Sequence, residues 1–213
     1  MENGIITRLF NVMAKTQTLG LVRHGETYAN IDKVWHGHTD TELTDNGRLQ
    51  TQKLGTYFHN YMRPDVIYSS PLQRAKNTAK AVAKSFDLPV NLDARLMEFG
   101  FGEWEGKTFE VLESEHNISA RLTEEGDFSP PDGESLNSVK IRMIEAIEDI
   151  IQAHPDNNVL IVSHGVALSI AISHYLNNDV KLWPQYAKSN TAFSELCLTT
   201  CSLTRFNQAE HLK

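Results

Sequence analysis

The chain lacks any uninterrupted apolar segment of about 20 residues, the length that a membrane-spanning helix requires. It is also poor in cysteine. Only Cys197 and Cys201 are present, and the four strand positions between them span about 13 Å, too far for a disulfide within one straight strand. Acidic residues outnumber basic ones, 27 to 20, which gives a formal net charge of −7. We therefore expect a cytoplasmic protein with free thiols, and with neither a membrane nor a nucleic acid as its partner.

The N-terminal stretch lacks the features of a signal peptide. Arg8 and Asn11 interrupt its apolar residues, and no small-residue cleavage site follows a continuous apolar region. We interpret residues 1–16 as an N-terminal extension that is either disordered or not native to the protein. The rest of the chain contains no internal repeat, and 213 residues of which 40% are hydrophobic suffice for one buried core. We therefore predict a single domain over residues 17–213.

Segments with the periodicity of strands and of helices alternate along the chain. Thr44 and Ser70 are the predicted N-caps of the first two helices, with Pro71 at the first helical position of the second. The unbroken apolar run at 159–162 is typical of a strand buried on both faces. This alternation predicts an α/β fold with a layered sheet. The predicted strands are residues 19–23, 65–68, 159–162, 192–198 and 202–206, and the predicted helices are residues 44–61, 71–86, 135–154 and 166–175.

The segment from Thr108 to Gly133 is less regular than the rest of the chain. It includes Pro130-Pro131 and Asp132-Gly133, which are typical of turns and loops. We interpret residues 107–133 as a lid-like insertion within the domain, and not as a separate domain.

The stretch Leu-Val-Arg-His-Gly-Glu-Thr at residues 21–27 carries the strongest chemical signal. The first predicted strand ends on Arg23 and His24, and Gly25 follows as a turn residue. Open α/β folds bind ligands at the carboxyl ends of their strands, so both side chains are placed for a ligand. The imidazole can attack an anionic centre as a nucleophile while the guanidinium holds oxygen atoms bidentately. An isolated Arg-His pair is more often a surface turn, so this interpretation depends on the other motifs.

Four other features fit the same chemistry. His164 follows the buried strand within a Ser-His-Gly sequence, so a second His-Gly pair lies at a strand end. Arg74 lies in the first turn of a predicted helix, where the helix dipole and free amides favour anions. Glu98 lies in an aromatic, glycine-rich loop that can desolvate a carboxyl group, and Asn30 is a neutral donor just after the first motif. Their order at successive strand ends favours one shared site.

Together these motifs resemble the histidine phosphatase superfamily, in the branch that includes cofactor-dependent phosphoglycerate mutase. The resemblance extends from about Leu19 to Phe206. It rests on the opening motif, on Ser-Ser-Pro-Leu-Gln-Arg-Ala at 69–75, on the Glu98 loop that ends in Trp-Glu-Gly, and on Ser-His-Gly. It implies a three-layer sandwich in which helices flank a mostly parallel central sheet, with a small lid insertion.

The resemblance assigns roles to the residues at the matching positions. It implies that His24 is the phosphorylated nucleophile and that Glu98 is the proton donor. It also implies that five residues surround the phosphoryl group. Three of them are catalytic as well, namely Arg23, Arg74 and His164, and the other two are Asn30 and His36. His36 stands where close relatives often carry Gln, as an outer phosphate contact. Glu103 and Glu105 fall where the family has a structural or solvent-facing acid.

The chemistry of a phosphomonoester fits these residues. A neutral imidazole avoids repulsion by the phosphate, while two arginines and a protonated His164 neutralise charge on the non-bridging oxygens. The leaving alkoxide needs a proton, and burial among aromatic rings beside an anionic phosphate is expected to favour the protonated form of Glu98. As a carboxylate, Glu98 can then activate water to hydrolyse the phosphohistidine. The arginines take the electrostatic role, so we expect neither a metal nor a cofactor.

A metal centre is the alternative use of the histidines. His36 and His38 have the spacing of a chelating pair, but no carboxylate or cysteine cluster with ligand spacing accompanies them. Arg23 and Arg74 would also repel a cation. We therefore do not predict a metal site.

Three functions remain open. The favoured one is metal-independent hydrolysis of a small phosphorylated metabolite through a phosphohistidine, with inorganic phosphate as product. Cofactor-dependent phosphoglycerate mutase uses the same chemistry, and a catalytically silent phosphate-binding regulatory module belongs to another class. The insertion from Lys107 to Gly133 carries two basic and seven acidic residues, a poor balance for retaining a polyanionic mutase intermediate. A silent module predicts a missing nucleophile or acid, and neither is missing.

Overall fold

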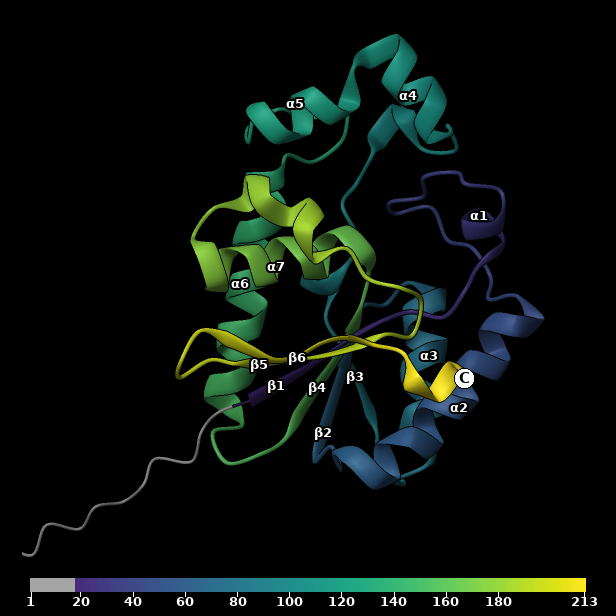
Figure 1. Cartoon of the computed structure of the whole chain (residues 1–213), viewed down its shortest axis with the longest axis vertical. Helices are drawn as coiled ribbons and strands as arrows, with labels where there is room; N and C mark the ends of the chain where they lie inside the picture. The colour runs from purple at the N-terminus through teal and green to yellow at the C-terminus, as the bar shows by residue number, and fades with distance from the viewer. Residues whose placement is uncertain (1–17) are drawn as a thin grey trace, which may run out of the picture.

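A six-stranded sheet forms the centre of the protein in the computed structural model, which describes residues 18–213 (Figure 1). The strand order is β3-β2-β4-β1-β5-β6. The first four strands in this order run parallel, and β5 is antiparallel to both of its neighbours, β1 and β6. The predicted extension at residues 1–16 lies outside the described residues. The strands are β1 (Thr18–Arg23), β2 (Val66–Ser69), β3 (Val90–Leu92), β4 (Val159–Ser163), β5 (Phe193–Cys197) and β6 (Ser202–Gln208).

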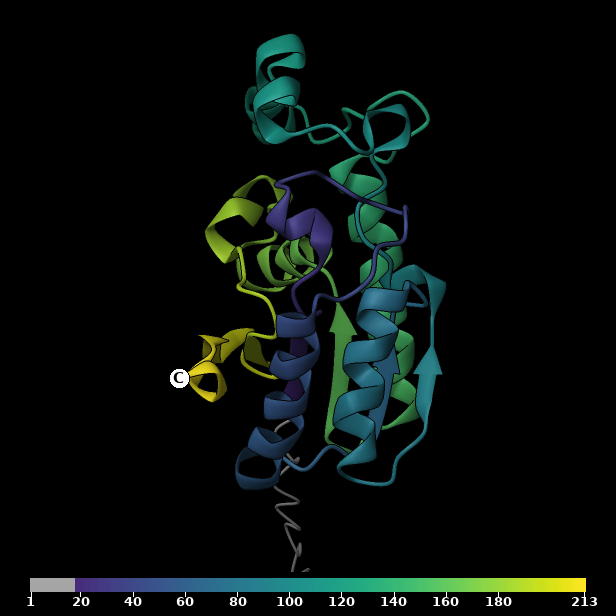
Figure 2. The ribbon, with the colours of Figure 1, turned by 90° about the vertical axis from the view of Figure 1, so that its right-hand side faces the viewer.

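Helices cover both faces of this sheet. α2 and α3 pack on one face, which is turned to the viewer in Figure 2, and α6 and α7 pack on the other. This arrangement confirms the predicted three-layer α/β sandwich with a mostly parallel sheet. The α-helices are α1 (Tyr28–Ile31), α2 (Asp45–Tyr61), α3 (Gln73–Lys84), α4 (Phe109–His116), α5 (Ile118–Glu124), α6 (Leu136–Ala153) and α7 (Gly165–Asn177), and the 3₁₀ turns are η1 (Ala94–Leu96), η2 (Gly102–Trp104), η3 (Val180–Tyr186) and η4 (Glu210–Leu212).

The side chains of the central strands divide between the two helical layers. Leu21 and Ile161 join the buried cluster with α6 and α7, whereas Val22, Leu160 and Val162 join the cluster with α2 and α3. Successive side chains of a strand point to opposite faces, so the apolar run in β4 feeds both cores at once. Each fully buried aliphatic side chain stabilises the fold by roughly 1.5–3 kcal/mol. The central strands are therefore fixed in position, and so are the residues that follow them.

The parallel pairing brings three strand ends together. Arg23 at the end of β1 lies opposite Ser163 at the end of β4, and Ser69 at the end of β2 lies opposite Val162. The residues that follow these strands therefore emerge at one edge of the sheet. Figure 2 shows β4, the green arrow, pointing toward this edge and toward the α4–α5 segment beyond it.

The helix starts were predicted with mixed success. Thr44 caps α2, where its hydroxyl accepts a hydrogen bond of 2.8 Å from Gly47 N, as predicted. The prediction for α3 was wrong, because the helix begins at Gln73, and Leu72 at its N-cap makes no side-chain hydrogen bond. The hydroxyl of Ser70 accepts from Leu72 N at 3.3 Å, just before the helix, and contacts His164 Nε2 at 2.8 Å. Ser70 therefore joins the turn before α3 to the end of β4.

The segment 107–133 is more regular than its sequence indicates. It contains α4 and α5, which meet at Asn117 in the left-handed conformation (φ 50°). Its apolar residues Leu112, Ile118 and Leu122 are buried in the same cluster as α6 and α7. Figure 1 shows both helices beyond the carboxyl edge of the sheet, over the side where the strands end.

The β5–β6 hairpin carries both cysteines. Cys197 ends β5 as predicted, but Cys201 lies in the following turn with φ 47° and not in a strand. Both thiols are free, as the sequence predicted. Among residues 18–213, the model contains no helix with the length and apolar character needed to cross a membrane.

Candidate active site

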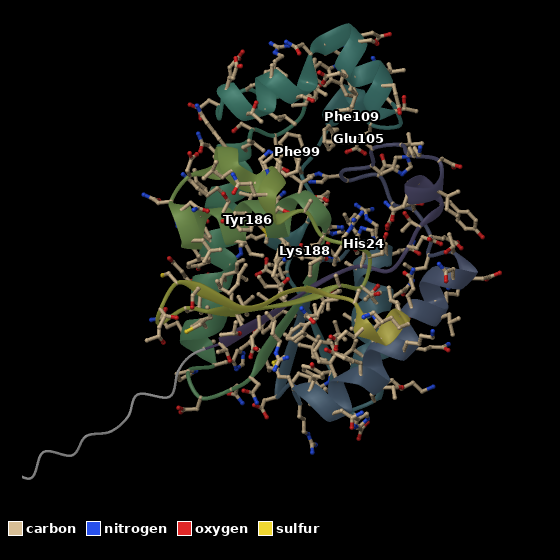
Figure 3. All side chains as sticks on the ribbon, viewed as in Figure 1. His24, Phe99, Glu105, Phe109, Tyr186 and Lys188 are labelled. Carbon is tan, nitrogen blue, oxygen red and sulfur yellow. The ribbon has the colours of Figure 1, made fainter. Side chains whose placement is uncertain are left out.

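A pocket of about 480 Å³ opens at the carboxyl edge of the sheet. Figure 3 shows His24 and Lys188 close above the sheet, with Glu105 and Phe109 further out toward α4. His164 is the one predicted site residue that does not line the pocket. The predicted residues that do line it are Arg23, His24, Asn30, His36, Arg74 and Glu98.

His24 is held in one tautomer. Its Nδ1 lies 2.7 Å from Gly25 O, and because a carbonyl only accepts, Nδ1 carries the proton and Nε2 keeps its lone pair. The side chain is 4% exposed. Burial lowers the pKa of His24 well below its ordinary value, and the charges of Arg23 and Arg74 lower it further. His24 is therefore a neutral imidazole with a free nucleophilic nitrogen.

Arg23 has most of its donors available for a ligand. Nη1 donates to Lys188 O at 2.5 Å, while Nε is buried and has no hydrogen-bond partner within residues 18–213. Burial lowers the pKa of Arg23, which the charge of Glu98 partly offsets. An unpartnered Nε–H beside the free Nη2 forms a bidentate edge for two phosphate oxygens.

Arg74, in contrast, is largely occupied by the protein itself. Its Nε donates to His164 Nδ1 at 3.2 Å. Its two Nη groups donate to three backbone carbonyls of residues 36–39, at 2.6 to 3.3 Å. A guanidinium has five N–H donors, so a single one remains for a ligand. Arg74 therefore holds the loop at residues 36–39 against the site, and phosphate binding by its one remaining donor stays a prediction.

His164 lies behind Arg74 and is fully buried. Because its Nδ1 accepts the proton of Arg74 Nε, its Nε2 carries the proton that it donates to Ser70 Oγ at 2.8 Å. Burial lowers the pKa of His164 well below its ordinary value, and the charge of Arg74 adds to this. His164 is thus neutral in this structure, which differs from the protonated form expected from the sequence. Its ring centroid lies 5.2 Å from that of His24, and direct contact with the phosphoryl group stays a prediction.

The carboxyl group of Glu98 reaches the N-terminus of α7. Oε1 accepts hydrogen bonds from Phe99 N at 2.9 Å and Ala167 N at 2.8 Å, and Oε2 accepts one from Val166 N at 3.2 Å. Hydrogen bonds from backbone N–H groups and the dipole of α7 both stabilise a carboxylate. These three contacts fix the carboxyl group at the pocket, and its role as a proton donor stays a prediction.

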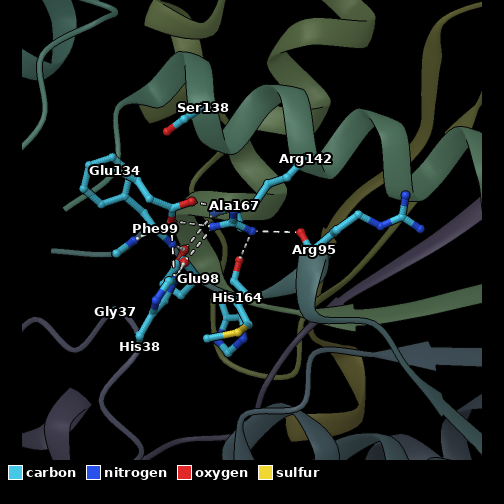
Figure 4. Close-up of polar contacts among 12 residues, drawn as sticks. Gly37, His38, Arg95, Glu98, Phe99, Glu134, Ser138, Arg142, His164 and Ala167 are labelled. Carbon is cyan, nitrogen blue, oxygen red and sulfur yellow. Dashed lines mark hydrogen bonds and ion pairs between the residues drawn. The ribbon is translucent and has the colours of Figure 1, made fainter. Parts of the chain in front are cut away.

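Arg142 on α6 fixes the loop that carries Glu98 (Figure 4). It donates to the carbonyls of Arg95, Met97 and Glu98 at 2.7 to 2.8 Å, and its Nε and Nη2 each donate to an oxygen of Glu134 at 2.7 Å. Burial alone would raise the pKa of Glu134, but hydrogen bonds from His38 and Arg142 outweigh it and lower the pKa to about 2. The ion pair between Arg142 and Glu134 therefore holds this loop in place.

The outer predicted residues are placed with donors toward the same pocket. Asn30 Oδ1 accepts from Thr27 N at 3.2 Å and from Asn190 Nδ2 at 3.0 Å, which leaves its Nδ2 group for a ligand. His36 Nδ1 is buried, and no partner for it exists in the described part of the chain. Substrate binding by both residues stays a prediction.

Glu105 and His38 have partners within the protein. Glu105 accepts from His38 N and Thr39 N, both at 2.7 Å, and does not line the pocket. Glu103 is exposed. His38 Nε2 contacts Glu98 O at 3.0 Å. Residues 18–213 contain no group of three or more His, Cys, Asp or Glu side chains arranged to hold a metal ion.

Two residues at the site were not predicted from the sequence. Lys188 is 5% exposed, lines the pocket and donates to Ser194 Oγ at 2.8 Å, and burial lowers its pKa to about 7. Asn190 donates to His24 O at 3.1 Å and so helps to hold the nucleophile. Neither belongs to a recognisable motif. Their only signal is their place directly before the strand predicted at 192–198.

The two arginines should respond differently to replacement. Arg23→Ala should slow turnover by roughly 10²–10³-fold with little loss of stability, because its free donors serve the transition state. Arg74→Ala should also lower the free energy of unfolding, by about 2–4 kcal/mol, since three backbone carbonyls and His164 Nδ1 lose their donor. Denaturant unfolding and vanadate binding measure the two effects. A larger stability loss in Arg23→Ala would contradict this division.

The buried histidines should make the protein less stable in acid. The pKa values of His24 and His164 lie well below 6.5 in the folded protein, mainly because of burial. Below pH 6.5 the unfolded chain binds more protons than the folded protein. The free energy of unfolding therefore decreases as the pH is lowered, by up to about 1.4 kcal/mol per pH unit for each histidine. Denaturant unfolding between pH 7 and 5 measures this. His164→Gln should reduce the slope, and a midpoint that is constant over this range would contradict the prediction.

Comparison with known proteins gives relatives over most of the chain. The model of the histidine phosphatase superfamily (branch 1) matches residues 19–207. The chain is 36% identical to the adenosylcobalamin/alpha-ribazole phosphatase of Escherichia coli over 160 residues, which covers 74% of this chain and 78% of that protein. It is 30% identical to the "probable phosphoglycerate mutase GpmB" of Citrobacter koseri over 194 residues, which covers 90% of this chain and 85% of that protein.

Solved structures agree with these relatives. The alpha-ribazole phosphatase from Shigella flexneri superposes with a TM-score of 0.80 at 30% identity, over 91% of this chain and 97% of that one. The phosphoserine phosphatase from Entamoeba histolytica, solved with 3-phosphoglyceric acid, superposes with a TM-score of 0.83 at 32% identity, over 92% of this chain and 99% of that one.

Proposed function

Since the chain belongs to branch 1 of the histidine phosphatase superfamily and is, like the phosphatases it resembles, a phosphomonoester hydrolase, we propose that it works through a phosphohistidine on His24. The observation that carries this proposal is the fixed tautomer of His24. Its Nδ1 proton is bound to Gly25 O, so Nε2 keeps its lone pair in a pocket that also holds Arg23 and Glu98. The substrate is a small phosphorylated metabolite, and inorganic phosphate is a product.

The reaction has two steps. In the first, the Nε2 lone pair forms a bond to phosphorus while the bond from phosphorus to the ester oxygen breaks, and the leaving oxygen takes a proton from Glu98. In the second, Glu98 as a carboxylate takes a proton from water, whose oxygen attacks phosphorus and releases His24. Arg23 neutralises the non-bridging oxygens in both steps. Glu98 gives one proton to the leaving alcohol and regains one from the attacking water, so the cycle is balanced.

The arginines supply the positive charge that a metal would otherwise provide. We therefore propose metal-independent catalysis, in which activity survives prolonged treatment with EDTA. We also propose a cytoplasmic location, which the two free thiols support.

Phosphoglycerate mutase is the second candidate, because relatives with that name align with most of the chain. A mutase must retain a bisphosphorylated intermediate until it is turned over. Beyond the two arginines, the basic residues that line the pocket are Lys33 and Lys188, and burial lowers the pKa of Lys188 to about 7, so that it is only partly charged near neutral pH. Glu110 lines the same pocket with a negative charge. This is little positive charge for a second phosphate, which favours hydrolysis.

One experiment separates the two activities. The enzyme is given 3-phosphoglycerate with and without 2,3-bisphosphoglycerate, and 2-phosphoglycerate and free phosphate are followed together. We expect phosphate release from simple monoesters without exchange of the two isomers. Rapid isomer exchange with little free phosphate would establish the mutase instead. An enzyme that releases no phosphate from any monoester would support the silent binding module.

A further inference from the structure

The outer wall of the catalytic pocket is aromatic. Trp35 follows α1, Phe101 belongs to the loop after Glu98, and Phe109 begins α4, so three separate segments contribute rings to one wall. Trp35 packs edge-on against Phe101 with ring centroids 4.6 Å apart, and it stacks on Phe109 at 6.0 Å with an interplanar angle of 27°. The rings therefore form a continuous apolar surface above the polar floor.

Backbone hydrogen bonds hold this wall in place. Trp35 N donates to Lys107 O at 3.0 Å, and Gly106 N donates to Trp35 O at 2.9 Å. An isolated β-bridge pairs Val34 with Thr108, whose hydroxyl caps α4. The segment after α1 and the start of the insertion are thus joined on both sides of Trp35. The wall is formed in the free protein, so no free energy of binding is lost in ordering it when a ligand binds.

Phe109 is the ring left without cover. Phe101 is buried, but 39% of Phe109 is exposed although it lines the pocket. The side chains that line the pocket add little net positive charge beside this wall. Lys33 and Glu110 line the pocket with opposite charges, and Lys188 is 5% exposed, with its Nζ donating to Ser194 Oγ. A polar acid bound here would leave the rings in water, whereas an apolar ring would cover them.

We infer that the alcohol part of the substrate carries a flat apolar ring, which lies against Trp35 and Phe109 while the phosphate occupies the floor. This inference rests on the proposed function, since it names the class of ester that the same pocket hydrolyses. A volume of about 480 Å³ lies within the roughly 300–1,000 Å³ of pockets that take ligands of drug size.

The test compares two primary alkyl monoesters, 2-(naphthyl)ethyl phosphate and glycerol 3-phosphate. Both leave as alkoxides of similar basicity, so their ratio of kcat/KM reports on the contacts of the alcohol. We expect the naphthyl ester to be preferred by at least about tenfold. Phe109→Ala should remove about tenfold from the naphthyl ester and less than twofold from glycerol 3-phosphate.

Val111→Ala is the matched control. Val111 lies on the same helix, is 36% exposed and does not line the pocket, so its replacement should change neither substrate. Phe109→Tyr keeps the ring and should keep the preference. Equal losses on both esters in Phe109→Ala, or a wild type without preference for the ring, would overturn the inference.

A binding measurement separates this inference from the proposed function. Calorimetry with 2-(naphthyl)ethylphosphonate and methylphosphonate, which cannot be hydrolysed, compares ring and methyl group without catalysis. If no monoester is hydrolysed but the naphthyl phosphonate binds more tightly and Phe109→Ala removes the difference, the hydrolase proposal fails and the ring site stands. If esters are hydrolysed but both phosphonates bind alike, the ring site fails and the hydrolase proposal stands.

Discussion

The His24→Ala variant will form no phosphoenzyme and will hydrolyse phosphomonoesters at least about 10⁴-fold more slowly than the wild type. The reason is that His24, whose Nδ1 donates to Gly25 O, keeps a free lone pair on Nε2 in the pocket beside Arg23. Both ring nitrogens of His164, the nearest alternative, are occupied by Arg74 and Ser70. Rapid quenching after mixing with ³²P-labelled substrate measures the acid-labile phosphoenzyme directly.

His59→Ala is the control for this variant, because His59 is exposed on α2 and lies outside the pocket. It should label and turn over like the wild type. Phosphate binding by His24→Ala, measured by calorimetry, shows whether the part of the pocket that contains Arg23 and Arg74 remains intact. Covalent labelling that persists in His24→Ala would remove His24 from the role of nucleophile.

The second large effect concerns the leaving group. Glu98→Gln should slow hydrolysis of an alkyl phosphate by roughly 10²–10⁴-fold, because an alkoxide leaves only with a proton. The same variant should slow hydrolysis of p-nitrophenyl phosphate by less than about tenfold, because that phenolate leaves without help. Steady-state kinetics on both esters give the ratio. Glutamine keeps one oxygen acceptor, so the contacts with α7 are retained in part.

Glu105→Gln is the matched control for Glu98. Glu105 has the same charge and accepts two backbone N–H groups, but it does not line the pocket. A loss in this variant should be equal on the two esters, since it would come from displacement of the loop at residues 38–39. An equal loss on both esters in Glu98→Gln would assign proton donation to another group.

The arrangement of the site follows from the pairing of strands that lie far apart in the sequence. The apolar runs that became β1 and β4 are recognisable, and their parallel pairing fixes Arg23 opposite Ser163. His24 and His164 must then emerge side by side, which is why their place could be predicted. The same holds for Arg74, since β2 pairs with β4.

The hydrogen bonds within the site could not be predicted in this way. Whether Arg74 serves the phosphate or the protein depends on carbonyls of residues 36–39, which lie on a loop without periodicity. The state of Glu98 depends on the start of α7, almost 70 positions further along the chain. Helices α4 and α5 have only eight and seven residues, too few turns to establish a helical period. Local pattern decides where strands end, and tertiary contacts decide what each side chain donates to.

The contact between Glu98 and α7 links chemistry to the backbone. In the proposed cycle, the carboxyl group that gains and loses a proton is also the acceptor for the amides of Val166 and Ala167. A protonated carboxyl is a weaker acceptor and carries no charge for the helix dipole. The proposal therefore predicts that the first turn of α7 is held less firmly during part of each turnover. Hydrogen exchange at these two amides would record the protonation state of the enzyme from within its own main chain.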